Sequence, residues 1–378
     1  MRGVGMVLNR LGLLTMAAAV VFLCAGSVLA EMVLDKEGKV KAEADLRLRF
    51  ESDWDSHRSD GTKRDDRDRL RLRARFGMTF QPTSVISAGF RIRSGSRASQ
   101  QSPHITLVDF DDNPTGDKHL LFDRYYLRAE SKNAWIWGGR NSMPFWRPNE
   151  FFWEDDVTPL GAAGGYKSSW NGGSLNLTGG YFTSPDGGVC FHGKLGAGQG
   201  VLSLQNGPLT WTFAGGLFAF FGEPGAIHLR NGNGERDYLI WVGNIQSKFK
   251  AGPVPLTLGL DLMHNSEDYG EHTPDNRERD GFVLSAIAGQ LAKRGDLQVG
   301  YFYAHVEKLA VNASYAQDDW IRWGNASQTD SSDYKGHEFR VAYGFSKSWN
   351  LMARLFLVDA ITSIQDGKRF RIDLNYRF

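Results

Sequence analysis

Apolar and polar residues alternate strictly over several stretches of this chain. Residues 40–50, 70–80 and 86–93 each carry an apolar side chain at every second position, and residues 368–378 repeat the pattern up to the last residue, Phe378. Successive residues of a β-strand point to opposite faces, so each stretch predicts a strand with one apolar and one charged face. Helical periodicity nowhere extends beyond a turn or two. The pattern therefore predicts an all-β protein.

Strand-like segments separated by turn signals continue along the rest of the chain. They predict sixteen strands, and eighteen remain an alternative because the glycines of residues 196–200 could form a turn. The strands are expected at residues 40–50, 70–80, 86–93, 121–130, 134–140, 162–168, 174–183, 188–205, 209–221, 237–249, 255–264, 281–292, 297–308, 337–346, 350–360 and 368–378.

The connectors between these segments largely alternate between long and short. Long polar connectors are expected at residues 51–68, 94–120, 141–161, 222–236, 265–280 and 309–336, with tight turns between them. Transmembrane barrels have long outer loops and short periplasmic turns, and soluble sandwiches have no reason for this asymmetry. The charged faces are also too ionic to form a second core. We therefore predict an antiparallel up-and-down transmembrane β-barrel, with its apolar face toward lipid, its charged face toward a wet lumen and both termini in the periplasm.

The N-terminal residues predict export from the cytoplasm. Arg2 and Arg10 precede an apolar stretch at residues 11–23, and small residues end at Ala30. These features predict a signal peptide over residues 1–30, cleaved near Ala30, and a single barrel domain over residues 31–378. The C-terminal strand resembles those of Gram-negative outer-membrane barrels, whose terminal Phe is read by the barrel-assembly machinery. The predicted location is the bacterial outer membrane.

Composition agrees with this class of protein. Charged residues make up 23% of the chain, and no segment has about eighteen continuous apolar residues, so helical membrane spans are excluded. Forty-four glycines and 12% aromatic residues suit a barrel with bends and aromatic girdles. We assign Trp135, Trp137, Trp211, Trp241, Tyr301 and Tyr303 to such girdles. Only Cys190 remains after processing, which excludes an intramolecular disulfide.

Arginines gather on the charged faces of the first strands, and carboxylates gather in the third long connector. Residues 141–161 are a candidate constriction loop, because a third outer loop that folds inward would narrow the lumen. Arginine rings favour anions and acidic rings favour cations. The candidate lumen-lining residues are Arg47, Arg49, Arg71, Arg73, Arg75, Arg91, Arg93, Arg124, Arg128, Glu154, Asp155 and Asp156. Acid on the loop opposite base on the wall would orient dipolar solutes. The alternative is that the arginines pair with neighbouring acids such as Asp45.

Four motifs resemble the Putative porin family of Gram-negative bacteria. They are Leu121-Phe122-Asp123-Arg124-Tyr125-Tyr126-Leu127, Gly138-Gly139-Arg140-Asn141, Pro144-Phe145-Trp146 and Trp153-Glu154-Asp155-Asp156-Val157-Thr158-Pro159-Leu160-Gly161. The specific motifs cover roughly residues 40–170, and the remainder matches by barrel pattern only. The resemblance implies passive outer-membrane transport without an assigned solute. Alginate-export barrels share the arginine-rich interior and are a related alternative.

We predict a porin, a water-filled channel for diffusion of small polar or charged solutes, including ions. The alternatives are a substrate-specific export or uptake barrel and, less favoured, a structural or adhesive barrel that does not conduct. Diffusion needs no chemistry, so the sequence predicts no enzyme, no cofactor and no metal. One polar segment has residue types that could bind a divalent cation, but we interpret it as a solvated loop; it contains His264, Glu267, Asp268, Glu271 and His272. The expected partners are outer-membrane lipid, the assembly machinery and small solutes, without nucleic acid. Because porins that resemble this chain commonly form trimers, a homotrimer is one possible assembly.

Overall fold

The computed structural model describes residues 32–223, 229, 233, 235–323 and 331–378. The predicted signal peptide, residues 1–30, lies outside the described residues, so its cleavage near Ala30 remains a prediction. The described residues form strands and loops, and none of them belongs to a helix long and apolar enough to cross a bilayer.

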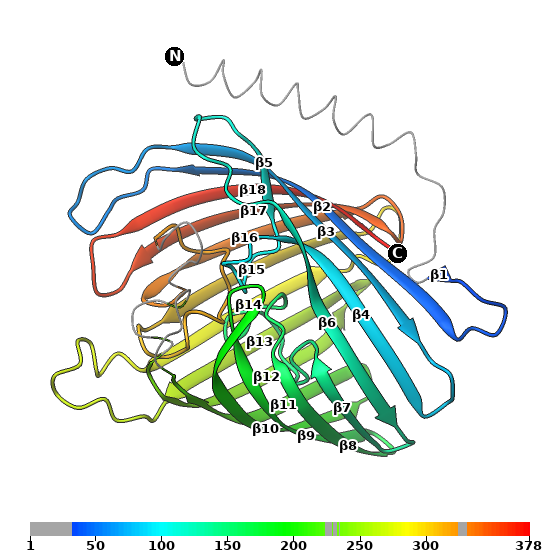
Figure 1. Cartoon of the computed structure of the whole chain (residues 1–378). Coiled ribbons are helices and arrows are strands. Elements are labelled where there is room, and N and C mark those ends of the chain that lie inside the picture. The colour runs from blue at the N-terminus through cyan, green and yellow to red at the C-terminus, as the bar shows by residue number, and fades with distance from the viewer. Residues whose placement is uncertain (1–31, 224–228, 230–232, 234, 324–330) are drawn as a thin grey trace.

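Strands run through the whole described chain (Figure 1). Their bounds are β1 Met32–Val33, β2 Val40–Trp54, β3 Arg67–Phe80, β4 Ile86–Gly95, β5 Ile105–Asp109, β6 His119–Glu130, β7 Ala134–Arg140, β8 Leu160–Trp170, β9 Gly173–Asp186, β10 Cys190–Asn206, β11 Leu209–Phe221, β12 Tyr238–Ala251, β13 Val254–Asn265, β14 Asp280–Gly289, β15 Leu297–Val306, β16 Tyr334–Gly344, β17 Trp349–Ala360 and β18 Asp366–Arg377.

Sixteen of these strands form a closed antiparallel barrel, which confirms the predicted fold class and strand number. Each barrel strand pairs with its neighbours in chain order, and β18 closes the ring on β2, with Leu374 opposite Leu48 and Arg371 opposite Glu51. The backbone groups of Phe378 and Ala44 exchange two hydrogen bonds of 3.0 Å, which seals the closing seam. Closure leaves no open sheet edge within the ring.

The two extra strands are short and do not extend the ring. β1 pairs with the first residues of β2 only. β5 pairs with the outer end of β3 at the point where β4 leaves β3 to follow β6. The alternative of eighteen barrel strands fails at residues 188–205, because β10 is one continuous strand with a register shift between Phe191 and Lys194 instead of a turn.

The two ends of the barrel differ as predicted from the connectors. One end, called the turn side here, carries short connectors such as residues 131–133 and 207–208. At the opposite end the barrel strands are joined by long connectors at residues 55–66, 96–118 (which contain β5), 141–159, 222–237, 266–279 and 307–333, of which only the described residues are placed, together with two short ones at 187–189 and 361–365.

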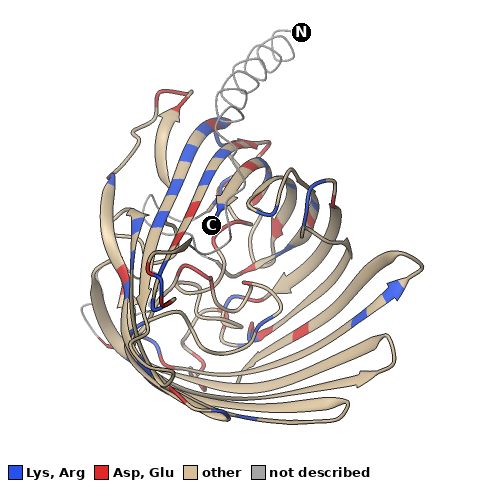
Figure 2. Ribbon diagram, turned by 90° about the vertical axis from the view of Figure 1, so that its right-hand side faces the viewer, with Lys and Arg blue, Asp and Glu red and all other residues tan. Residues whose placement is uncertain are grey.

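Only one sector of the inner wall is strongly charged. Figure 2 shows bands of Lys, Arg, Asp and Glu along a few neighbouring strands, whereas most other barrel strands carry few charged residues. In the rest of the ring, inward side chains such as Phe182, Phe218 and Ile240 are apolar and at most 2% exposed. The expectation that charged faces line the lumen all round was therefore wrong for this second sector, because folded-in loops cover it and form an apolar core there.

Trp137 illustrates this correction. Its ring is 2% exposed and packs against Phe182, with the ring centroids 5.8 Å apart. It belongs to the inner core and not to a lipid-facing girdle. Trp211 and Trp241, in contrast, are 38% and 54% exposed on the outer surface, where girdle aromatics belong.

Candidate functional site

Two loops from the long-loop end fold into the lumen and meet there. They are residues 141–159, between β7 and β8, and residues 307–323, the first part of the connector between β15 and β16; we call them the inward loops. The backbone N–H of Glu154 donates to the carbonyl of Tyr315 at 2.8 Å. The Phe151 and Trp320 rings pack edge to face with centroids 4.8 Å apart. These contacts make the two loops one internal body.

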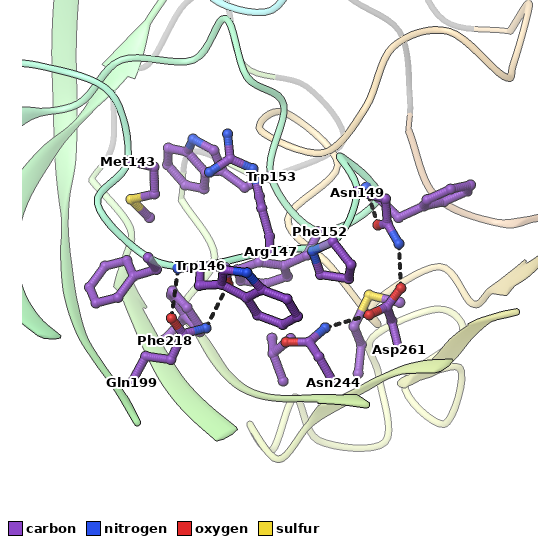
Figure 3. Close-up of a pocket in the computed structure, with 15 residues that line it drawn as sticks. Met143, Trp146, Arg147, Asn149, Phe152, Trp153, Gln199, Phe218, Asn244 and Asp261 are labelled. Carbon is purple, nitrogen blue, oxygen red and sulfur yellow. Dashed lines mark hydrogen bonds between the residues drawn. The ribbon is translucent and has the colours of Figure 1, made fainter. Parts of the chain in front are cut away.

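Apolar and amide contacts hold the 141–159 loop against the wall (Figure 3). The ring of Phe145 packs edge to face on Phe218 of β11, with centroids 5.2 Å apart. The Gln199 side chain accepts from the Trp146 N–H at 2.7 Å and donates to the Trp146 carbonyl at 2.8 Å. Asn149 donates to Asp261 of β13. Because each of these groups is satisfied by its partner, the loop has a defined position in the lumen.

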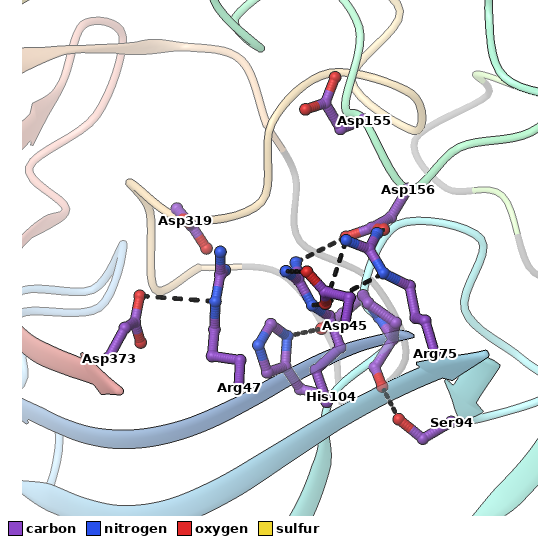
Figure 4. Close-up of polar contacts among 12 residues, drawn as sticks. Asp45, Arg47, Arg75, Ser94, His104, Asp155, Asp156, Asp319 and Asp373 are labelled. Carbon is purple, nitrogen blue, oxygen red and sulfur yellow. Dashed lines mark hydrogen bonds and ion pairs between the residues drawn. The ribbon is translucent and has the colours of Figure 1, made fainter. Parts of the chain in front are cut away.

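Asp156 fastens the same loop to the arginine sector (Figure 4). Its carboxylate contacts Arg73 at 3.6 Å and also pairs with Arg75, two arginines that lie on β3. Asp45 of β2 accepts from Arg73 at 2.8 Å and from Arg75 at 3.2 Å. Burial acts to raise the pKa of Asp156, but the guanidiniums of Arg75 and Arg73 hold it well below its ordinary range. The charges of the loop and of the wall thus meet in direct ion pairs. An electric field across the lumen that orients dipolar solutes would need an open gap between these charges, and Asp156 leaves none.

Asp319 fastens the second inward loop to the same sector. It accepts from Arg354 at 2.7 Å and from Arg49 at 3.3 Å, and it also pairs with Arg371. These arginines come from β17, β2 and β18. This contact is not expected from the sequence, in which residues 309–336 have the length and polarity of an ordinary outer loop. The signal was present: Leu309, Val311, Tyr315, Trp320 and Ile321 are unusually apolar for a loop expected in water.

Farther toward the long-loop end, the arginine sector is closely packed and internally neutralised. Glu51 pairs with Arg371 at 2.5 Å, with Arg71 at 3.5 Å and with Arg69. Asp53 pairs with Arg369 at 2.5 Å and with Arg67 at 3.0 Å. Both carboxylates are at most 1% exposed. The alternative interpretation, that arginines pair with neighbouring acids, describes this part of the wall.

Two polar cavities lie in the lumen, with volumes of about 540 and 510 Å³. Asp45, Arg75, Asp155 and Arg377 line both, so the cavities are neighbours. Lys347 and Ser348, in the turn between β16 and β17, line the larger one, which places it toward the turn side. Among the predicted site residues, these cavity walls contain Arg47, Arg73, Arg75, Arg91, Arg124, Glu154, Asp155 and Asp156.

The remaining four predicted site residues have other surroundings in the described structure. Arg49 is 1% exposed between Asp373 and Asp319. Arg71 contacts Glu51 and Ser102. Arg93 is fully buried and donates to the Ser99 carbonyl at 2.7 Å. Arg128 lies at the turn-side end of β6 and pairs with Glu130 at 3.0 Å. The other eight predicted site residues therefore line the cavities, whereas these four do not.

Basic groups with few acidic partners remain around the cavities. Arg47 bonds the Asn375 amide at 2.7 Å, and its nearest carboxylate, Asp373, is 3.9 Å away. Arg124 reaches Glu43 only at 4.0 Å. Within the described residues, Lys347 and Arg377 form no ion pair, and both line the larger cavity. Cations that are only weakly compensated, or that form no ion pair, therefore face the cavity space.

Carboxyl groups that form no ion pair among the described residues also line the larger cavity, on the inward loops. Burial and neighbouring carboxylates raise the pKa of Glu150 and of Glu154 well above the ordinary value. Burial and the charge of Asp319 raise the pKa of Asp318 to about 6, although Arg371 opposes this shift. These groups carry less negative charge near neutral pH than exposed carboxylates would. No group of His, Cys, Asp and Glu side chains among the described residues is arranged to hold a metal ion.

Comparisons with known proteins agree with this geometry. Residues 40–186 match the family model described as Putative porin. OprB of Pseudomonas putida has a similar structure, with a TM-score of 0.59 at 10% identity over 90% of this chain and 94% of that one. OmpF of Salmonella typhi, in a complex with daunomycin, has a TM-score of 0.53 at 14% identity over 92% and 100%. OmpT of Vibrio cholerae in its trimer form has a TM-score of 0.50 at 12% identity over 90% and 99%.

A search of curated proteins gave no match. The structural neighbours share too little sequence to show more than the fold. The family match covers the arginine-rich strands, the 141–159 loop and the strands that follow it. Together, the family match and the barrel support an outer-membrane channel for solute diffusion. Residues 40–186 thus carry the sequence pattern of the Putative porin family, and the described chain has the fold of an outer-membrane porin.

Proposed function

We propose that this barrel lets small polar solutes diffuse passively across the outer membrane and that its turn-side cavities favour anions. One observation carries the proposal: a closed barrel contains two neighbouring polar cavities whose walls hold basic groups with few acidic partners. A narrow low-dielectric passage concentrates the field of such groups. Diffusion through it requires no catalytic residue and no cofactor.

The preference for anions follows from which charges remain uncompensated. Asp45, Asp156, Asp319 and Glu338 are each paired with arginine, so they add little net field. Arg47, Arg124, Lys347 and Arg377 are left to act on a solute. Arg47 and Arg124 keep their charge at any physiological pH. The other cavity-lining residues then mainly position the inward loops and shape the passage. They are Arg73, Arg75, Arg91, Glu154, Asp155 and Asp156.

Reconstitution into planar bilayers tests the channel itself. The refolded barrel is expected to give stepwise conductance increments in neutral lipid, whereas a heat-denatured sample of the same preparation should give none. Because the inward loops occupy much of the lumen, the increments should be small for a barrel of sixteen strands. A folded barrel that stays closed to ions at every voltage would refute the proposal.

The selectivity of the channel should depend on pH through Glu150, Glu154 and Asp318. Their raised pKa values mean that acidification neutralises them first, while Asp155, Asp156 and Asp319 stay ionised. Negative charge is therefore lost as the pH falls, and the ratio of chloride to potassium permeability should rise between about pH 8 and about pH 5. Reversal potentials in a salt gradient measure this ratio. Glu154→Gln should weaken the pH dependence, and an equal ratio at both pH values would contradict the assignment.

The proposal extends to the surroundings of the barrel. Its apolar outer face fits outer-membrane lipid, and the strand that ends at Phe378 fits recognition by the barrel-assembly machinery. The similarity to a barrel solved in its trimer form is consistent with a homotrimer. Cross-linking in native outer membranes would test the trimer, and N-terminal sequencing of the mature protein would test cleavage near Ala30.

A further inference from the structure

The two inward loops enclose an acidic recess on one side of the larger cavity. Glu150 and Glu154 come from the 141–159 loop and Asp318 from the 307–323 loop, and all three line the cavity wall. The bond between the Glu154 N–H and the Tyr315 carbonyl fixes the two loops against each other at this point. The recess is therefore a built feature of two packed segments.

No basic side chain of the described residues lies within ion-pair distance of the three recess carboxyl groups, although Arg371 acts on Asp318 from farther away. The paired acids of the lumen sit within ion-pair distance of arginine, as Asp319 does at 2.7 Å from Arg354 and Glu338 does at 2.7 Å from Arg340. Within the described residues, Glu150, Glu154 and Asp318 form no ion pair. Glu154 is only 6% exposed, and its Oε2 atom is buried without a hydrogen-bond partner. A buried carboxyl oxygen without a partner is costly, so this atom indicates a missing hydrogen-bond partner, which is a donor whenever the carboxyl group is ionised.

Aromatic side chains on the same cavity wall indicate the kind of donor. Phe151 and Trp320 line the same cavity with 4% of each exposed, and Trp320 is held in place because its indole N–H donates to Glu338 at 3.2 Å. Aromatic faces next to carboxylates suit organic cations. A metal ion fits less well, because no acidic or histidine group of the described residues has metal-binding geometry.

We propose that the recess formed by Glu150, Glu154 and Asp318 binds the ammonium group of a solute in the lumen. An ammonium group supplies up to three donors and the positive charge that the recess lacks. The inference rests on the proposed channel function, because the recess faces the internal cavity. It also narrows the class of solute: Arg47 lines the same cavity, so a small solute with both an ammonium and an anionic group would meet a partner for each.

Isothermal titration calorimetry on the full barrel, folded in an uncharged detergent, tests the site without requiring transport. The probes are n-butylammonium chloride and sodium butyrate, which share an alkyl chain and differ in the sign of their charge. The wild type should bind butylammonium, and Glu154→Gln should weaken that affinity by at least about tenfold, since a charge-assisted contact of about 1.4 kcal/mol corresponds to tenfold. Asp318→Asn should weaken it as well, which gives a second variant should the first fail to fold.

Glu43→Gln is the matched control, because Glu43 lines the other cavity and lies outside the recess. Its affinity for butylammonium should equal that of the wild type. Equal affinity in the wild type, Glu154→Gln and Asp318→Asn, or no binding by the wild type, would overturn the inference. Conductance of the same preparation separates the two proposals. If the barrel conducts but does not bind butylammonium, only the ammonium site is refuted. If it binds butylammonium but never conducts, only the channel function is refuted.

Discussion

Asp319→Ala is expected to lower the free energy of unfolding by about 3–5 kcal/mol, the usual cost of removing one partner of a buried ion pair, and to raise the conductance. Asp319 is the contact that ties the 307–323 loop to Arg49, Arg354 and Arg371. Burial acts to raise its pKa, yet these guanidiniums hold the pKa well below the ordinary value. Without the carboxylate, three buried arginines each lose one anionic partner, and the loop keeps only weaker links to the arginine sector, such as the bond from Arg369 to the Asp319 carbonyl at 2.7 Å.

The neighbouring residue provides the control. Asp318 has the opposite pKa shift, to about 6, and its largest influences are burial and the charge of Asp319. Asp318→Ala should therefore leave stability unchanged or slightly improved. Guanidinium chloride unfolding in detergent micelles measures both variants, and single-channel recording measures conductance. If the two alanine variants lost equal stability, the anchoring role of Asp319 would be wrong.

Trp153→Ala is expected to have an effect of similar size by a different mechanism. Trp153 is 1% exposed, stacks on Tyr315 of the other inward loop with centroids 5.2 Å apart, and donates its indole N–H to the Val157 carbonyl at 3.0 Å. Its ring also lies 6.3 Å from that of Phe220 on β11. Truncation of a buried Trp costs about 3–5 kcal/mol because of lost contacts and the cavity left behind. The inward loops should separate, and the conductance should rise.

Trp241→Ala is the matched comparison, because Trp241 lies on the outer surface with 54% of it exposed. Its loss removes no contact between the inward loops, so the conductance should keep its wild-type value. The measurement is again single-channel conductance, with unfolding in denaturant as the check on stability. A Trp153→Ala barrel with wild-type conductance would show that the packing of the inward loops does not set the width of the passage.

The barrel could be predicted from the sequence because the alternation within each strand shows which of its side chains share a face. Alternation in residues 40–50 and 368–378 indicates which side chains share a face, and the structure pairs these two segments as the closing seam. Connector lengths indicate the two ends of the barrel. Both patterns depend only on residues close together in the sequence, so they can be recognised without knowledge of long-range contacts.

The interior could not be predicted in the same way, because it depends on which loop reaches which strand. Asp156 was recognised as a candidate, yet its pairing with Arg73 and Arg75 joins residues far apart in sequence. Asp319 was missed because a loop's inward fold leaves no periodic pattern. The apolar inner sector was missed for the same reason: Phe218 and Ile240 alternate as a lipid-facing row would, and only the folded-in loops show that these side chains face inward.

The reversal potential of the wild-type channel in a potassium chloride gradient, compared with that of Arg47→Ala, is the decisive measurement for the proposed preference for anions. Arg47 faces the larger cavity and has its nearest carboxylate at 3.9 Å. The wild type should therefore show the sign of a chloride-preferring channel, and Arg47→Ala should move the potential toward zero or beyond it. A wild-type potential with the sign of potassium preference, or one that Arg47→Ala leaves unchanged, would contradict a passage lined by weakly compensated arginine.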